Sequence, residues 1–296
     1  MRNMSHCDAA ILPDRGAVRI GGADARKFLQ GLITNDMEKA RDGAAIHAGL
    51  LSPQGKILFE FFVVPAGDSF LLEGPRTMTA DLSKRLGFYK LRADVTVTDE
   101  STIQVAASWG DDIIAAVDGA IVYRDPRLAE LGYRALLPAG IGIGTALGCT
   151  EMSAEAYHAM RIGLGVPEGG RDFAFGDTFP HEALFDQLNG VDFAKGCYVG
   201  QEVVSRMEHR GTARKRVVPV SGDVPLPATG AEIMAGSAPI GMLGSVNGSD
   251  GLALLRLDRA GEAVAASKPL TAGGVPIRLR RPVFARFDMP VEASVS

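Results

Sequence analysis

The sequence is poor in side chains that bind metals. Cys7, Cys149 and Cys197 are the only cysteines among 296 residues, and no two of them form a Cys-x-x-Cys pair. A local zinc ribbon and a thioredoxin-type redox motif are therefore excluded. The five histidines lack His-x-His and His-Glu-x-x-His spacing, so no self-contained histidine metal site is expected. Because an odd number of cysteines in a cytosolic protein does not favour disulfides, we expect each one to be a small buried side chain or a reactive thiol.

Long hydrophobic runs are missing as well. The most apolar windows, 57–64 and 135–148, are too short for a membrane-spanning helix. Charged residues interrupt the first twelve positions, which excludes the apolar core of a secretory signal. The formal net charge is only -4, which does not favour a chain whose whole surface binds nucleic acid. We therefore expect a soluble, cytoplasmic protein with no membrane contact and no direct nucleic-acid partner.

The residues that are present indicate a mixture of strands and helices. Residues 9–12 and 17–20 flank a Pro/Gly turn and predict a hairpin, and Asp24 is placed to cap a helix that contains Phe28 and Leu32. Further strands are predicted at 46–51, 57–64, 69–73, 95–98, 103–107, 121–123 and 133–137, with helices at 77–86, from 111, and at 154–163 after Ser153. The short connections favour an α+β fold with mainly antiparallel sheets.

The carboxy-terminal part has a different pattern. After Val217, short apolar runs alternate with Gly, Pro and Asn-Gly turns, and no helix pattern is evident. This predicts a small all-β barrel or sandwich. We expect an α+β region over residues 1–205 with two subdomains, a β-barrel over 206–285, and a tail over 286–296.

One segment, Lys195 to Glu202, combines several reactive features. Gly196 and Gly200 flank Cys197 and Tyr198, and glycine permits positive φ or a close approach of the backbone to a ligand. Lys195 lies two residues from the thiol and would favour the thiolate, while Gln201 and Glu202 can anchor the turn. The residues fit equally well a structural turn into a strand, with Cys197 as packing.

A basic stretch follows directly. Residues 206–216 contain Arg206 and four further Lys or Arg residues, against one acidic residue. The stretch is either a cationic rim for a polyglutamyl tail, a phosphate or RNA, or a solvated strand edge.

The eight residues from Lys195 to Glu202 match the KGCYxGQE signature of the YgfZ family without a departure. That family comprises folate-binding relatives of the glycine-cleavage T-protein. Three further blocks resemble the same family, and together they cover most of the chain: Phe28 to Asp36 (FLQGLITND), Leu51 to Lys56, and Gly165 to Pro167 with Pro180 to Ala183.

The resemblance implies a T-protein-like fold, an α+β body around a folate cavity with a carboxy-terminal β-barrel. It implies a protein that binds tetrahydrofolate or another folate and supports the assembly or repair of iron–sulfur clusters, and through them radical enzymes that modify tRNA. On this basis Cys197 is the functional thiol and Lys195 its important neighbour. The implied folate contacts are Glu182, Tyr157, Tyr198 and Arg206.

One departure bears on enzymatic activity. Aminomethyltransferases carry an acidic pair on the strand after the Gly-Gly hairpin, whereas this chain has Leu58 and Phe59 there. Apolar side chains cannot orient or deprotonate an amine of folate, and Glu60 could replace the acids only after a register slip. Aminomethyl transfer is therefore disfavoured, and whether the chain is an enzyme stays open.

Other functions remain as alternatives. A folate-dependent one-carbon transferase and a scaffold that contacts RNA or an acidic protein through residues 206–216 both fit the sequence. If Cys197 holds a cluster transiently, a partner or second subunit must share it, because one cysteine cannot supply the four ligands of a [2Fe–2S] site. The expected partners are folate and iron–sulfur assembly or client proteins.

Overall fold

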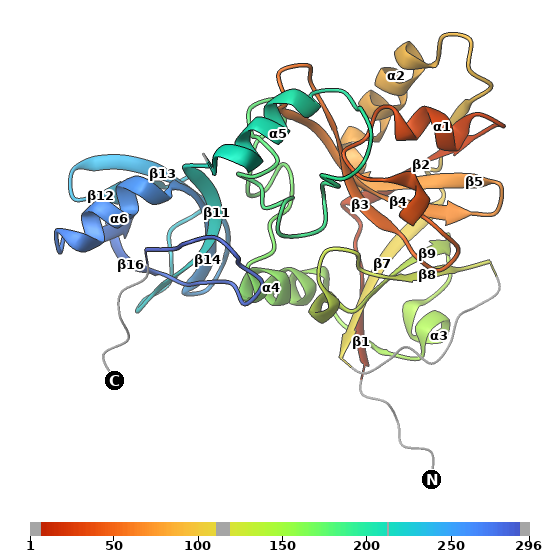
Figure 1. Ribbon diagram of the computed structural model, residues 1–296. Coiled ribbons are helices and arrows are strands. Elements are labelled where there is room, and N and C mark those ends of the chain that lie inside the picture. The colour runs from red at the N-terminus through yellow and green to blue at the C-terminus, as the bar shows by residue number, and fades with distance from the viewer. Residues whose placement is uncertain (1–6, 111–118, 212, 291–296) are drawn as a thin grey trace. The chain divides into compact units, whose positions relative to one another are not determined.

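The computed structural model describes residues 7–110, 119–211 and 213–290 (Figure 1). The helix predicted from Asp111 begins outside these residues. The chain forms two compact units. Unit 1 comprises Met1–Tyr157 and Leu188–Gln201, and unit 2 comprises His158–Gln187 and Glu202–Ser296.

Unit 1 contains two five-stranded sheets. Their orders are β10-β1-β7-β9-β8 and β3-β4-β5-β2-β6, and all neighbouring strands are antiparallel except β1 and β10. The elements are β1 (Cys7–Ile11), β2 (Arg15–Gly21), α1 (Ala25–Gln30), β3 (Ile46–Leu51), β4 (Ile57–Ala66), β5 (Ser69–Pro75), α2 (Thr79–Lys90), β6 (Thr96–Asp99), β7 (Ile103–Gly110), β8 (Ile121–Arg124), β9 (Tyr133–Pro138), α3 (Ile143–Leu147) and β10 (Thr150–Glu151), with short 3-10 turns at Met37–Lys39, Arg76–Met78 and Ala129–Leu131.

Strand β4 is covered on both faces, as its apolar sequence predicts. Phe59, Phe61 and Val63 belong to the core beneath α1 and α2. Phe62 and Val64 point the opposite way and pack with apolar side chains of the other sheet. This alternation buries strand β4 between two cores and fixes which of its residues face each one.

Two local predictions in unit 1 are wrong. Strands β1 and β2 both form, but they enter different sheets and make no hairpin. Asp24 precedes α1 without capping it, because its Oδ2 accepts from the Asp94 backbone N–H at 2.9 Å. In both cases a partner distant in sequence replaces the local one.

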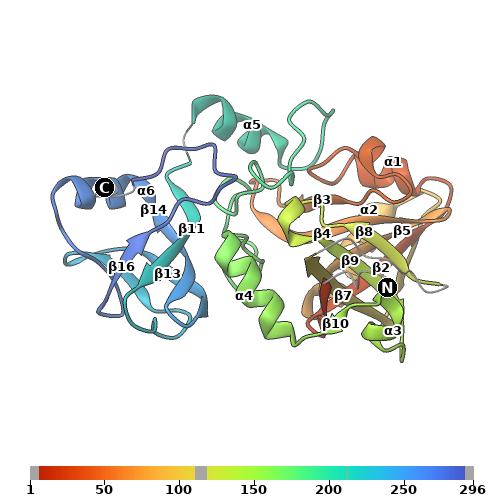
Figure 2. The same cartoon turned by 90° about the horizontal axis from the view of Figure 1, so that it is seen from below.

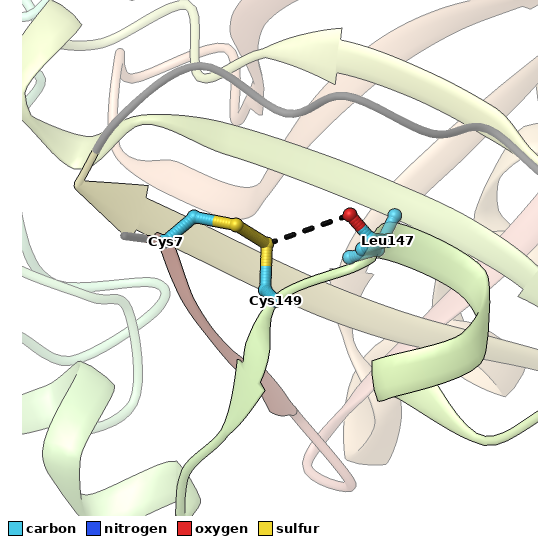
Figure 3. The surroundings of a disulfide bond; sticks show 3 residues. All are labelled: Cys7, Leu147 and Cys149. Carbon is cyan, nitrogen blue, oxygen red and sulfur yellow. Dashed lines mark hydrogen bonds between the residues drawn. A yellow bond between two sulfur atoms is a disulfide. The ribbon is translucent and has the colours of Figure 1, made fainter. Parts of the chain in front are cut away.

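The expectation that every cysteine is free is also wrong. Cys7 and Cys149 form a disulfide with their Cα atoms 4.9 Å apart (Figure 3). The two residues are 142 positions apart, and the parallel pairing of β1 with β10 brings their segments together. Cys197 is therefore the only free thiol in the chain.

Unit 2 contains a closed barrel with the strand order β11-β14-β13-β12-β15-β16, drawn in teal and blue in Figures 1 and 2. Its elements are α5 (Gln201–Arg210, which begins on the last residue of unit 1), β11 (Lys215–Gly222), β12 (Glu232–Ala235), β13 (Ala238–Asn247), β14 (Asp250–Arg256), α6 (Leu257–Ala265), β15 (Leu270–Ala272) and β16 (Val275–Leu279), while α4 (Ala154–Leu164) spans the boundary.

The predicted fold class, an α+β body with mainly antiparallel sheets and a small carboxy-terminal barrel, is confirmed. Helix α6 was missed, and its residues Leu257, Ala260 and Ala263 pack into the barrel core. Ser153 caps α4 as predicted, since its Oγ accepts from the Ala156 N–H at 3.4 Å. Among the described residues no helix is long and apolar enough to cross a membrane.

Candidate functional site

The side chain of Lys195 points into unit 1, where it is 7% exposed. Its Nζ donates to three backbone carbonyl oxygens, those of Gln30 at 2.8 Å, Ile33 at 2.7 Å and Asn35 at 3.0 Å. An ammonium group has three N–H bonds, so all its donors are used. Lys195 therefore ties the signature segment to the chain that follows helix α1, the FLQGLITND block of the sequence.

The surroundings of the Lys195 ammonium set its protonation. Burial lowers the pKa of Lys195 to about 8, although the nearby carboxylates of Asp36 and Asp192 act in the opposite direction. The ring of Tyr198 lies 5.1 Å from Nζ and adds a cation–π contact. Because every donor of Lys195 meets a carbonyl oxygen, Lys195 acts as an anchor and does not donate to the Cys197 thiol.

Cys197 occupies the exposed part of the same segment. Its thiol is free and exposed, whereas Lys195 and Tyr198 on either side are buried. Burial raises the pKa of Tyr198 to about 12, with a further contribution from Asp192, so its hydroxyl stays protonated at neutral pH. The two buried neighbours hold the backbone while the thiol remains accessible to a metal ion or an electrophile.

Gly200 shows why the second glycine of the segment is required. Its φ is +82°, and an added Cβ would lie 2.5 Å from the Ser52 carbonyl oxygen and 3.1 Å from the Gly55 Cα. Only glycine permits this approach to the β3–β4 hairpin. Gly196, in contrast, faces open space. The segment is thus held at Lys195 and at Gly200, with Cys197 between the two.

A cavity of about 340 Å³ lies in unit 1. It is lined by Asn35, Lys39, Ala45, Ile46, His47, Pro126, Asn189 and Val191. Asn35 organises its wall, since Nδ2 donates to the carbonyl oxygens of His47 at 2.8 Å and Asn189 at 2.7 Å. At the rim, Lys39 pairs with Asp192 at 2.8 Å. The cavity therefore shares Asn35 with the surroundings of Lys195, and its lining residue Lys39 is paired with Asp192, which also interacts with the Lys195 ammonium.

His47, which lines this cavity, contacts the buried Glu60, and the sequence alone did not predict this pair. The Nε2 of His47 is 3.0 Å from Glu60 Oε1, and Nδ1 is 2.9 Å from the Leu188 carbonyl oxygen. Both ring nitrogens of His47 thus lie within hydrogen-bond distance of an oxygen atom, and the Glu60 carboxyl group is held against the imidazole. Burial favours the neutral acid, but the His47 hydrogen bond and charge, with Arg127 and Arg15, hold the pKa of Glu60 below its usual range.

Glu60 lies on the same face of the sheet as His47, and a register shift precedes it in strand β4. Leu50 pairs with Phe59 but Leu51 pairs with Ile57, so Leu58 is an extra residue in the ladder. The shift lies before Glu60, which itself pairs with Gly49. A carboxylate with a lowered pKa that is bound to His47 is a weak base.

Tyr157 and Tyr198, two of the expected folate contacts, lie in unit 1 but do not line this cavity. The Tyr157 hydroxyl is fully buried and accepts from Arg127 at 3.0 Å and from Arg134 at 2.6 Å. Together with Asp125 these residues form a charged cluster in the core. Tyr157 thus has the environment of a core residue.

Glu182 and Arg206, the other two expected contacts, lie in unit 2. Glu182 Oε2 accepts from the Phe179 N–H at 2.9 Å, and the residue lines a separate cavity of about 370 Å³ with Val203 and Met207. Arg206 is exposed and pairs with Glu202 at 2.6 Å. The basic stretch begins on helix α5 and ends with Lys215 and Arg216 on strand β11, so the signature segment leads into a helix and the alternative of a turn into a strand is wrong.

His181, Asp186 and Glu208 in unit 2 offer atoms close enough together to bind a metal ion. His181 Nε2 lies 3.0 Å from Glu208 Oε2. Asp186, however, accepts two hydrogen bonds of 2.9 Å from Arg216. A metal ion would have to displace that guanidinium, so the group functions as an ion-pair network.

Known proteins share this architecture. The structure of the glycine cleavage system aminomethyltransferase T from Bartonella henselae superposes with a TM-score of 0.72 at 15% identity, covering 95% of this chain and 87% of that one. Residues 214–287 match the family described as the CAF17 C-terminal beta-barrel domain. The chain thus has an aminomethyltransferase-T-like fold with a CAF17-type barrel.

Sequence comparison identifies the family. The iron-sulfur cluster assembly factors IBA57 of Homo sapiens and Mus musculus are each 35% identical to this chain, which covers 76% of either protein. Their alignments include 82% and 83% of this chain. The chain belongs to the IBA57 family of iron-sulfur cluster assembly factors. It is 36% identical over 228 residues to the Mycosarcoma maydis homolog but spans only 56% of that protein, with 72% of its own length aligned.

The comparison contradicts the cytoplasmic location expected from the sequence. The related IBA57 proteins are named as mitochondrial. The expectation depended on the absence of a secretory signal. That absence does not distinguish the cytoplasm from the mitochondrion.

Proposed function

We propose that this chain assists the assembly of iron–sulfur clusters, with Cys197 as the group that contacts the cluster or its donor. The observation that carries the proposal is the exposed, single free thiol held between a triply bonded Lys195 and a closely packed Gly200. Family membership supports the process, since the related proteins are named as iron-sulfur cluster assembly factors.

The cluster is cargo in this proposal. One thiol supplies one of the four ligands that a [2Fe–2S] cluster takes, so the remaining ligands come from a partner that delivers or receives it. An accessible thiol on a fixed backbone suits such a shared, transient complex, because less conformational entropy is lost on binding. Cluster-containing client enzymes are the proposed beneficiaries, among them radical enzymes that modify tRNA.

We also propose that unit 1 binds tetrahydrofolate or a related folate in the cavity beside Asn35. Its volume of about 340 Å³ is within the range of small-molecule sites and suits the pterin ring. The lining combines apolar Ile46 and Pro126 with the polar side chains of Asn35 and Asn189. Lys39 at the rim is 58% exposed and offers a cation to the glutamate carboxylates of folate. Bound folate would supply a one-carbon carrier or a reductant close to the signature segment.

An anaerobic titration with tetrahydrofolate separates the two parts of the proposal. Ala45→Trp fills the cavity and should abolish binding, while Ala44→Trp is the matched control, since exposed Ala44 does not line the cavity. Cys197→Ala should bind folate as the wild type does. If Ala45→Trp binds tetrahydrofolate as tightly as Ala44→Trp and the wild type, the cavity assignment is wrong. The role of Cys197 is then tested separately.

A further inference from the structure

Helix α2 presents an unpartnered face on the surface of unit 1. On one side, Leu82 and Leu86 are buried and the helix packs against β2 and β6. On the opposite side, Lys84, Arg85 and Phe88 are exposed at positions i, i+1 and i+4, which share one face of a helix. The exposed residues Leu91 and Arg92 follow immediately after the helix. These five residues are called the α2 face below, and Figure 1 shows the helix at the edge of the unit, beside α1.

Two large apolar side chains of the α2 face lie in water. Phe88 is 67% exposed and Leu91 is 89% exposed, and they are three positions apart. Single exposed hydrophobic residues are ordinary, but neighbouring ones rimmed by polar groups are typical of interaction sites. Aromatic residues in particular are enriched at protein interfaces.

Leu91 has an unusual backbone conformation. Its φ is +42°, in the region that favours glycine, at the position where a helix commonly ends on glycine. A leucine there costs conformational energy, and its side chain gains nothing from burial within the chain. The Leu91 side chain is thus exposed at a position where the backbone conformation favours glycine.

The cations around these apolar residues have no partners within the part of the chain described here. Lys84, Arg85, Lys90 and Arg92 make neither an ion pair nor a side-chain hydrogen bond among those residues. The segment 79–94 carries only two acidic residues, Asp81 and Asp94, against these four. Elsewhere in unit 1 arginines such as Arg15 and Arg127 are paired with carboxylates. The α2 face therefore offers three positive charges and two exposed apolar side chains, with the half-buried Lys90 as a fourth cation next to them.

We propose that the α2 face docks a protein partner through an acidic amphipathic helix of that partner, with apolar side chains on one face and carboxylates beside them. Phe88 and Leu91 would pack against the apolar side chains of that helix, and the cations of the α2 face, with Lys90 beside them, would orient the partner and accelerate its approach. A membrane surface fits less well. Leu82 and Leu86 are committed to the protein core, so only two apolar side chains could enter a bilayer, and membrane binding scales with apolar area. The proposal does not depend on Cys197 or on folate.

The test uses a helical peptide of leucine, phenylalanine and glutamate, with the apolar residues on one face, as the probe. Its affinity for the full chain is measured by fluorescence anisotropy at 50 and 300 mM salt. Lys84→Glu/Arg85→Glu and Leu91→Gly should each weaken binding about tenfold or more, and higher salt should weaken wild-type binding. Leu91→Gly suits the positive φ, so it removes the side chain without disturbing the fold.

Matched controls change exposed residues outside the α2 face. Lys268→Glu and Met242→Ala, both on exposed residues of unit 2, should bind the peptide as the wild type does. Absent wild-type binding, or equal losses in controls and α2-face variants, would overturn the proposal. So would comparable affinity for phosphatidylcholine–phosphatidylglycerol vesicles, or a dimer of the wild type that Leu91→Gly dissociates, since these identify a membrane or a second copy as the occupant.

Discussion

The Lys195 ammonium donates to the carbonyl oxygen of Ile33 at 2.7 Å across 162 positions of sequence. With the bonds to Gln30 and Asn35, this contact joins the two most recognisable motifs of the chain, FLQGLITND and KGCYVGQE. The lysine therefore fixes the segment that carries Cys197, and the thiol projects from a fixed base. Lys195 is thus the anchor of this segment, and Cys197 is its proposed reactive group.

Replacing Lys195 with methionine separates anchoring from thiol activation. The variant leaves three buried carbonyl oxygens without their donor, so unfolding in urea should show a loss of about 2–4 kcal/mol. The rate of Cys197 alkylation by a maleimide in the folded protein should not fall, because the ammonium does not contact the thiol. A tenfold slower alkylation at unchanged pH would indicate thiolate stabilisation by Lys195 and contradict anchoring as its role.

The lowered pKa of Lys195 predicts how stability changes with pH. Its value of about 8 in the folded chain lies below the ordinary 10.5, so between these pH values the unfolded chain binds more protons. Stability of the wild type relative to Lys195→Met should therefore rise as the pH increases from 8 to 10.5. Urea unfolding at pH 7, 8, 9 and 10 measures this difference. If the stability of the wild type relative to Lys195→Met stays constant or falls over this range, the folded chain keeps the Lys195 ammonium protonated. That result would contradict the lowered pKa.

The buried pair of His47 and Glu60 makes a third prediction. Glu60→Gln removes a buried carboxylate that interacts with His47, Arg127 and Arg15, and should destabilise the chain by about 3–5 kcal/mol. Because the folded pKa of Glu60 is lowered, the stability that this group contributes should be lost as the pH falls through that value.

A double-mutant cycle checks that the effect comes from the pair. Glu60→Gln and His47→Gln, alone and combined, should show a coupling of about 1–3 kcal/mol in urea unfolding. Additive losses would show that the two side chains act independently, in conflict with the 3.0 Å contact.

Local patterns in the sequence predicted much of the fold. Strands form where apolar runs predict them, at β3, β4 and β5 and along the turn-separated runs of the barrel. The failures involve partners far apart in sequence. Strands β1 and β2 are correct as strands but pair with β7 and β5, and no local pattern encodes that choice.

The candidate site shows the same limit. The signature predicts Cys197 and Lys195 as site residues. The three carbonyl partners of Lys195, however, belong to Gln30, Ile33 and Asn35, far away in the sequence. The His47–Glu60 pair depends on how β3 and β4 align, which the sequence of either strand alone does not specify. The Cys7–Cys149 bridge likewise depends on a strand pairing that spacing alone does not disclose.

The most direct test of the central claim measures iron–sulfur enzyme activity in cells that lack this protein. Cells carrying the wild type, Cys197→Ala, or the exposed-site control Met242→Ala are compared at equal protein levels. The account predicts that the wild type and Met242→Ala restore the cluster-dependent activity and that Cys197→Ala does not, although it folds. Full restoration by Cys197→Ala would contradict the role of this thiol in cluster assembly.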